Sequence, residues 1–418
     1  MDLTQWLEYI ERQHPKQIDM GLDRVRAVAR EMGLQRPAPR VITVGGTNGK
    51  GSTVAFIEAM ARGAGWRVGA YTSPHLRAYN ERVRINGADI GDAPLVSAFE
   101  AVEEARGGVP LTYFEYGTLA ALWCFEQAGL DLVVLEVGLG GRLDATNIVD
   151  PDVAVVTTVD LDHQDYLGAD REAIGFEKAG IARAWKPLVL GDEDPPSSVL
   201  RHAYAIGASA VRIGCDFFFE TTADGWHWRE LGCEYELPLP QMAAPVQVRN
   251  AAVAIAALRA LDAPLTEPVI AEAVANAKLD ARLQAFDREG VAVVVDVAHN
   301  PQAARELGRW LAASPVPGTT HAVFAALGDK DVEGVVAALA GTVGCWHLAG
   351  LPHAGDRAQS GARLAARLAG TAAANATAHD DVTTALAATL ARATPGDRVL
   401  VLGSFLTASA ALAWLDRD

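Results

Sequence analysis

A glycine-rich segment at Gly45–Ser52, with the sequence GGTNGKGS, constrains the fold of this chain more than any other stretch. It follows the apolar run Val41–Val44 and precedes a helical pattern. Glycines let backbone N–H groups turn inward, and a following helix N-terminus adds positive potential, so this arrangement is typical of a polyphosphate site. It departs from the common pattern G-x-x-x-x-G-K-[ST], because Val44 stands at the first glycine position and Gly51 follows Lys50. We therefore predict a phosphate-binding loop of a variant form.

Short apolar runs alternate with helical patterns along most of the chain. Runs such as DLVVLEVG and VAVVTTV are nearly continuous, as in strands of a parallel sheet that is covered on both faces. The alternation predicts an α/β fold with a doubly wound, mainly parallel sheet, and the turn-rich residues 217–239 predict antiparallel hairpins. Because 418 residues exceed what one hydrophobic core usually covers, we expect two domains, residues 1–284 and a smaller, Rossmann-like domain at residues 285–418.

The composition restricts the class of partner. A formal net charge of −16 argues against nucleic acid or an anionic membrane as the main partner. The four cysteines are scattered without metal or redox spacing, which favours reduced thiols in a cytoplasmic protein. The first residues, MDLTQWLEYIERQHPKQ, are too polar for a signal peptide, and we find no apolar stretch long enough to span a bilayer. We expect a cytoplasmic enzyme that is a monomer.

Polar side chains follow the ends of several predicted strands, where ligands bind in open α/β sheets. They are Ser73 and His75; Glu136; Arg142, Asp144 and Asn147; Asp160, Asp162, His163 and Asp165; and, in the second domain, Asp296, His299, Asn300 and Ser404. Single motifs also have structural alternatives. DLDHQD could be a solvated acidic loop, TYFEYG could supply core aromatic residues, and VGLGG could be a glycine turn, since it lacks the dinucleotide-binding spacing. Together, however, a phosphate loop, a carboxylate, a histidine and a hydroxyl at one sheet edge indicate Mg²⁺ beside a nucleotide.

Several long motifs resemble one family over nearly the whole chain. In order they are TVGGTNGKGST, YTSPHLRAYNERVRING, TYFEYGTLAAL, LEVGLGGRLDATN, LDHQDYLG, EKAGI, VDVAHNP and GDKD. The chain resembles the folylpolyglutamate synthase/dihydrofolate synthase family, which is related to the Mur peptidoglycan ligases. The segments IDMGLDRV and TYFEYGTLAALW look most like the bifunctional bacterial members.

The resemblance implies roles for the residues that match the family motifs. The ATP phosphates would be held by Gly46, Thr47, Asn48, Gly49, Lys50, Gly51 and Ser52, with further nucleotide contacts from Asn250, Arg282 and Asp296. One Mg²⁺ would be ligated by Ser73 and Glu136, and a second by Glu136 and His163. Lys178, in EKAGI, matches the lysine that the family carboxylates to a carbamate. Lys50, Glu136, His163 and Lys178 are thus the expected catalytic group.

The resemblance also implies where the other substrates bind. The pterin end would lie near Ile18, Asp19, Thr112, Tyr113, Phe114, Glu115, Leu143, Asp144 and Ala145, and the incoming glutamate near His299 and Ser404. Two departures from the family pattern stand out. The chain has Asp280-Ala281-Arg282 where P-G-R is common, and Leu406 where an aromatic residue or histidine is common.

The expected activity is an ATP-dependent amide ligase that joins L-glutamate to dihydropteroate and to reduced folates through an acyl phosphate. Two alternatives remain open at this point. One is a Mur-type ligase of UDP-muramyl peptides, which the early position of the phosphate loop disfavours. The other is a P-loop switch or ATPase, which needs neither the second-domain motif VDVAHNP nor a pterin site.

Overall fold

The computed structural model describes residues 1–16 and 18–417. These residues form two compact units. The first comprises residues 1–241 and 247–278, and the second comprises residues 242–246 together with the chain from Leu279 onward. We expected a boundary at residues 284/285, whereas the second unit begins before its first strand, because the segment from Ala281 to Leu283 already bonds to residues 296 and 297 of that unit. Along the described residues we find no helix with both the length and the apolar character that crossing a bilayer requires.

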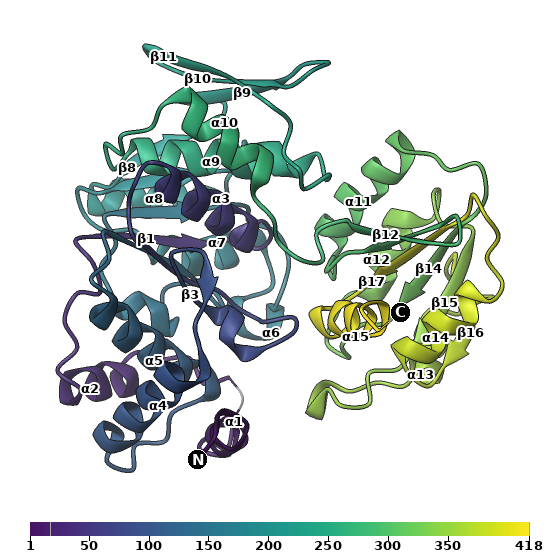
Figure 1. The fold of residues 1–418 in the computed structure, drawn as a ribbon, viewed down its shortest axis with the longest axis horizontal. Coiled ribbons are helices and arrows are strands. Elements are labelled where there is room, and N and C mark those ends of the chain that lie inside the picture. The colour runs from purple at the N-terminus through teal and green to yellow at the C-terminus, as the bar shows by residue number, and fades with distance from the viewer. Residues whose placement is uncertain (17, 418) are drawn as a thin grey trace. The chain divides into compact units, whose positions relative to one another are not determined.

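The first unit is built on an eight-stranded sheet (Figure 1). Its strands, in spatial order, are β4 (Ala88–Asp89), β3 (Val83–Ile85), β2 (Val68–Tyr71), β5 (Leu132–Glu136), β1 (Arg40–Gly45), β6 (Val153–Val156), β7 (Pro187–Leu190) and β8 (Ser209–Arg212). The six strands from β2 to β8 run parallel, and only β3 and β4 are antiparallel. As a result, the carboxyl ends of β2, β5, β1 and β6 lie side by side at one edge.

Helices cover both faces of this sheet, which explains why its central strands β5, β1 and β6 are buried at nearly every position and mostly apolar. The helices of the unit are α1 (Leu3–Glu11), α2 (Asp23–Glu31), α3 (Lys50–Gly63), α4 (Asp92–Arg106), α5 (Tyr113–Ala128), α6 (Gln164–Leu167), α7 (Arg171–Ala179), α8 (Ser197–Ile206), α9 (Val246–Arg259) and α10 (Glu267–Asn276). One core cluster joins α1, α2, α4 and α5 to β1 and β5, and a second joins α7 and α8 to β6 and β7. Helix α3 packs against β1, β2 and β5.

The predicted hairpins form a separate antiparallel sheet of β9 (Phe217–Thr221), β10 (Trp226–Glu230) and β11 (Cys233–Leu237). Along β10, buried Trp226 and Trp228 alternate with exposed His227 and Arg229, as expected for a sheet with one covered face. The indole of Trp228 donates a 3.1 Å hydrogen bond to the carbonyl of Ala252 in α9. This bond ties the small sheet to the helices beneath it (Figure 1).

The second unit contains a six-stranded sheet with one antiparallel edge strand. In spatial order its strands are β12 (Gln284–Arg288), β13 (Val291–Val295), β17 (Arg398–Leu402), β14 (Thr320–Phe324), β15 (Cys345–Ala349) and β16 (Thr377–His379). Its helices are α11 (Pro301–Ala313), α12 (Val332–Leu339), α13 (Gly361–Arg367), α14 (Val382–Leu390) and α15 (Phe405–Leu415). Strands β13 and β17 are parallel neighbours, so the residues that follow them share one edge.

Candidate active site

The glycine-rich loop lies between β1 and α3, as the sequence predicts. Two of its glycines are required by backbone conformation and by space. Gly46 has φ = 143°, and a Cβ there would lie 1.9 Å from Oγ1 of Thr157. Gly49 has φ = 89°, and a Cβ there would lie 2.6 Å from Oδ1 of Asn250. The second contact also places Asn250, from α9, directly against the loop.

Residues that follow β6 brace the loop, and sequence reasoning did not single them out. The amide of Thr47 donates to the carbonyl of Thr158 at 2.7 Å, and the amide of Asn48 donates to Oγ1 of Thr158 at 3.1 Å. The hydroxyl of Thr157 donates to the carbonyl of Asn48 at 2.6 Å. The paired threonines at the end of VAVVTTV were the available signal, because hydroxyls at the end of a buried strand need partners.

Lys50 is the first residue of α3, so its charge lies at the mouth of the loop. Its Nζ is 3.1 Å from the carbonyl of Gly46 and 3.3 Å from that of Thr47. A cation held over a loop of inward N–H groups at a helix N-terminus is suited to a polyphosphate. Ser52 and Thr53, the hydroxyl residues of the motif, are buried within the first turns of α3.

Glu136 and Ser73 meet at the same edge. Glu136 ends β5 and pairs in register with Val44 of β1, immediately before the loop. Its carboxylate is buried, and Oε2 accepts a 3.2 Å hydrogen bond from the amide of Ser73, which follows β2. A buried carboxylate beside a hydroxyl residue is a hard-oxygen donor pair of the kind Mg²⁺ uses.

His163 lies on the other side of the loop, after β6. It has φ = 50° and precedes α6, and its amide donates to Oδ1 of Asp162 at 2.9 Å. Within the described parts of the chain, no three or more His, Cys, Asp and Glu side chains are grouped as a complete metal cage.

Lys178 is buried near the end of α7. Burial, followed by the positive charge of Lys50, lowers the pKa of Lys178 to about 7, while Asp162 and Asp144 oppose this change. The charges that shift this pKa belong to residues of the candidate site. The adjacent Glu177 is paired with Arg142 at 2.9 Å, so a simple Lys178–Glu177 ion pair does not explain the lysine.

Arg24, which sequence reasoning missed, joins two of the predicted pterin-binding segments. Its Nη1 is 2.6 Å from Oδ2 of Asp19, and its Nη2 is 3.0 Å from Oε1 of Glu115. Glu115 also completes the N-terminal cap of α5, since its Oε2 accepts from the amide of Thr112 at 2.8 Å. Ile18, beside Asp19, is half-buried. The segments around residues 19 and 115 are therefore held together by one guanidinium.

The third predicted pterin segment lies next to the second. The ring of Phe114 covers Gly138, where a Cβ would come within 2.7 Å of it. The carboxylate of Asp144 organises this loop: Oδ2 accepts from the amides of Gly138 and Leu139, and Oδ1 accepts from the amide and hydroxyl of Thr146. Burial raises the pKa of Asp144, and these bonds oppose the rise. Asp144 thus shapes the loop that carries Leu143 and Ala145.

Comparison with known proteins decides the family. Residues 44–258 match the model of the Mur ligase middle domain, and residues 281–405 match that of the Mur ligase glutamate ligase domain. The dihydrofolate synthase/folylpolyglutamate synthase of Escherichia coli K12 is 45% identical over 415 residues, which cover 99% of this chain and 96% of that relative. The chain belongs to the dihydrofolate synthase/folylpolyglutamate synthase family. The resemblance and the fold class expected from the sequence are thereby confirmed.

Solved structures of this family agree over their full lengths. FolC of E. coli in complex with DHPP and ADP has a TM-score of 0.94 at 44% identity, covering 100% of this chain and 98% of that one. A bifunctional folylpolyglutamate synthase/dihydrofolate synthase with Mn, AMPPNP and L-glutamate bound has a TM-score of 0.92, also at 44% identity and the same coverage.

In this member of the family, the second unit gathers several predicted residues around Phe405. The guanidinium of Arg282 lies 5.5 Å from the centre of that ring, and His299 lies 6.2 Å from it. Ser404 caps α15, and its Oγ accepts from the amide of Thr407 at 3.0 Å. Phe405 was not among the predicted residues, because an aromatic residue at a helix start gives no chemical signal on its own.

Asp296 follows β13 and binds the segment that precedes β12 in the second unit. Its Oδ2 accepts from the amide of Leu283 at 3.0 Å, and its Oδ1 accepts from that of Ala298 at 2.8 Å. Burial raises the pKa of Asp296, and the charge of Arg282 opposes the rise. Ala281, at the glycine position of P-G-R, has φ = 53° and is fully buried, so the chain forms a left-handed turn here without glycine.

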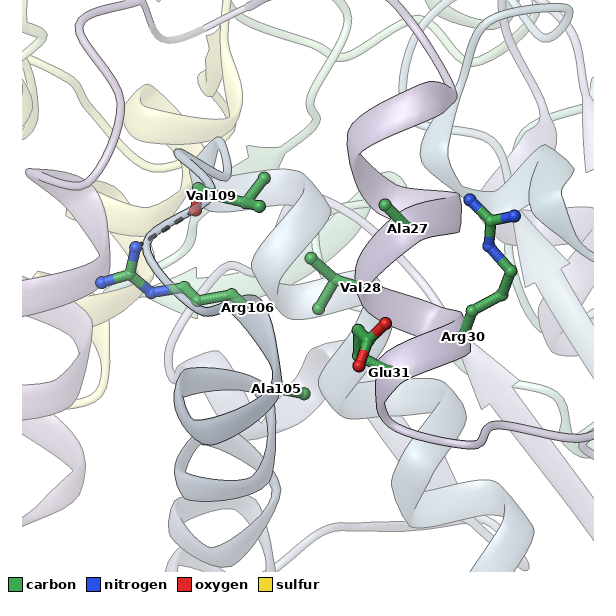
Figure 2. Close-up of a pocket in the computed structure, with 7 residues that line it drawn as sticks. All are labelled: Ala27, Val28, Arg30, Glu31, Ala105, Arg106 and Val109. Carbon is green, nitrogen blue, oxygen red and sulfur yellow. Dashed lines mark hydrogen bonds between the residues drawn. The ribbon is translucent and has the colours of Figure 1, made fainter.

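A hollow elsewhere in the first unit is not part of this site. It has a volume of about 430 Å³ and lies between α2 and the end of α4 (Figure 2). None of the predicted site residues lines it. Its Arg106 is already bonded to Glu103, Tyr9, Gln13 and the carbonyl of Val109, so this guanidinium holds α1 and α4 together.

Proposed function

We propose that this chain is an ATP-dependent ligase that joins L-glutamate to dihydropteroate and to the glutamate tail of reduced folates. The observation that carries the proposal is the pairing of full-length family membership with a variant phosphate loop that lies beside Glu136 and Lys178. The relatives' complexes with ADP, AMPPNP, Mn, DHPP and L-glutamate are consistent with the proposed substrates and with a divalent metal.

The first half-reaction activates the pterin-side acid. A carboxylate oxygen attacks the γ-phosphorus of ATP, the bond to the bridging oxygen breaks, and ADP leaves with that oxygen. Lys50 and the N–H groups from Gly49 to Ser52 at the start of α3 face the developing negative charge, while the amides of Thr47 and Asn48 hold the loop to Thr158. Charge stabilisation of this kind is the main contribution a protein makes to phosphoryl transfer. Asn250 contacts the loop from α9, and Arg282 and Asp296 are the proposed nucleotide contacts of the second unit.

Glu136 with Ser73, and Glu136 with His163, are the proposed ligands of two Mg²⁺ ions. The oxygen donors at the end of β5 and after β2 fit a hard cation that keeps water and phosphate ligands. When bound, Mg²⁺ supplies positive charge at the phosphate oxygens. Glu136 ends β5 and His163 follows β6, the two strands on either side of β1, so the proposed donors would approach a phosphate at the loop from two sides.

We propose further that Lys178 carries a carboxylate. Because burial lowers its pKa to about 7, a large fraction of the amine is neutral near neutral pH and can attack CO2. The N–C bond forms as the amine loses a proton, and the product is a carbamate anion. A buried cation beside Lys50 is thereby replaced by an anion, which suits a site that gathers metal ions.

The second half-reaction forms the amide. The α-amine of L-glutamate, held by His299 and Ser404, attacks the acyl carbon and forms the C–N bond. The bond between the acyl carbon and the bridging oxygen breaks, inorganic phosphate leaves with that oxygen, and the nitrogen loses a proton. The chain supplies position and charge here, and the acyl phosphate supplies the reactivity. Leu406, the departure from the family pattern two residues after Ser404 in the sequence, is 46% exposed.

An ATP turnover assay tests the proposed function. The purified protein is incubated with ATP, Mg²⁺ and L-glutamate, and the pterin acid is dihydropteroate in one series and a reduced folate in a parallel series. Turnover should require both a pterin acid and L-glutamate. ATP hydrolysis that is independent of both would instead support a P-loop ATPase, and turnover only with a UDP-muramyl peptide would support a Mur-type ligase.

A rescue experiment tests the carbamate. Lys178→Ala should be nearly inactive and partly restored by small carboxylates that can enter the vacated space. Lys178→Arg should resist rescue, because it keeps a positive charge in place. An Lys178→Arg variant with most of the wild-type activity would contradict the carbamate without affecting the ligase proposal.

A further inference from the structure

Arg82 is a buried arginine in the segment that joins β2 to β3. Only 8% of the surface of Arg82 is exposed to solvent. The Nε atom donates a 2.9 Å hydrogen bond to Nδ1 of His75. The guanidinium lies 5.1 Å from the ring centre of Tyr79 and 5.4 Å from that of Tyr113. Two aromatic faces and one imidazole therefore hold the plane of this cation.

Arg82 differs from Arg106, which is also buried, and from the half-buried Arg24 in having no acidic partner among the described residues. Arg24 and Arg106 are each paired with carboxylates. In contrast, among residues 1–16 and 18–417 no Asp or Glu forms an ion pair with Arg82, and its Nη atoms make no hydrogen bond. The neighbouring Glu81 accepts instead from the amides of Leu76, Arg77 and Ala78.

A buried cation without a counter-ion is costly, so its persistence indicates a partner that is not part of the described chain. The guanidinium fork matches a carboxylate, because two parallel N–H groups can donate to two oxygens. The two Nη groups of Arg82 are available for this, since only Nε is used by His75. Stacking on two tyrosine rings would hold the fork in a fixed plane.

The position of Arg82 indicates which carboxylate this is. Its carbonyl accepts a 2.9 Å hydrogen bond from the amide of Thr72, and the next residue, Ser73, bonds to Glu136. On its other side, Tyr113 is the first residue of α5, within the segment expected to bind the pterin end. Arg82 therefore lies between the proposed metal ligands and the proposed pterin segment.

We propose that Arg82 binds and orients the carboxylate of the pterin-side acid, the group that is to be phosphorylated. This inference rests on the proposed function. Before reaction, an anionic carboxylate has to approach the anionic γ-phosphate, and a fixed guanidinium offsets their repulsion and aims one oxygen at phosphorus. The incoming glutamate and the nucleotide are not the ligands of Arg82.

Substitution of Arg82 tests this assignment through separate Michaelis constants. Arg82→Met keeps a flexible apolar stem against the two tyrosine rings and removes the fork and its charge. The KM for dihydropteroate should rise by about tenfold or more, whereas the KM values for ATP and L-glutamate should stay within about twofold. Arg82→Lys keeps the charge but loses the fork and should show a smaller rise in the same constant. Arg77→Met, at an exposed arginine of the same segment, is the matched control and should leave all three constants unchanged.

Each other outcome overturns the inference. An unchanged KM for dihydropteroate in a folded Arg82→Met variant would make Arg82 purely structural, and a selective rise in the KM for L-glutamate would assign it to the amino acid. If Arg82→Met does not fold, Arg82→Lys decides the question. Michaelis constants equal to those of the wild type in Arg82→Lys would show that the guanidinium fork does not bind the carboxylate. Failure of the wild-type protein to ligate any pterin acid would instead reject the proposed function itself.

Discussion

Replacing Lys178 by methionine should stabilise the protein while abolishing its activity. Lys178 is buried, and burial together with Lys50 lowers its pKa from 10.5 to about 7. The folded state therefore disfavours the charged amine relative to the unfolded chain. Methionine has a similar length and no charge, so the variant removes this penalty and leaves the surrounding packing largely intact.

The size of the effect follows from the two pKa values. Below pH 7 the lysine is charged in both states and the penalty is fully present; it declines as the pH rises toward 10.5, where the unfolded chain also loses its proton. With each pKa unit worth about 1.36 kcal/mol, the penalty is about 4 kcal/mol at pH 7.5 and only about 1 kcal/mol at pH 9.5. The advantage of Lys178→Met should shrink accordingly between these two conditions.

Thermal unfolding in CO2-free buffer measures this difference, because carbamate formation is then prevented. At pH 7.5 the midpoint of the variant should lie roughly 8 °C above that of the wild type, at about 2 °C per kcal/mol for a unit of this size. The control is Lys278→Met, at an exposed lysine of the same unit, which should change stability by less than about 0.5 kcal/mol. A Lys178→Met variant that is less stable than wild type, by an amount independent of pH, would refute the reasoning.

Two further substitutions test the phosphate loop and the proposed metal ligands. Lys50→Ala removes the cation that faces the transferring phosphate, so kcat should fall by on the order of 10²-fold or more while the unfolding temperature stays close to that of wild type; near-normal turnover of the folded variant would reject the loop assignment. Glu136→Gln preserves shape and removes the charge that both proposed metal sites share, so the Mg²⁺ concentration needed for half-maximal activity should rise markedly. An unchanged magnesium titration would make Glu136 a structural residue.

The strand–loop–helix at residues 40–63 could be predicted because its signals are contiguous. An apolar run, glycines that need positive φ, and a lysine at the helix start all lie within one short segment. The antiparallel hairpins of residues 217–237 were predictable for the same reason, since alternation and turn residues are local. The unit boundary was less accurate, because it depends on which sheet the segment near Ala281 bonds to.

The sequence by itself determined the order of strands and helices, the position of the phosphate loop, and the family to which the chain belongs, because each is written in spacing and in contiguous motifs. Only the tertiary structure decided which distant residues meet. It places Thr158 under the loop, joins Asp19 to Glu115 through Arg24, and leaves Arg82 without an acidic partner in the described chain. It also lowers the pKa of Lys178. The physical reason is that burial and charge pairing depend on neighbours brought from elsewhere in the chain, and the sequence around each residue carries no record of them.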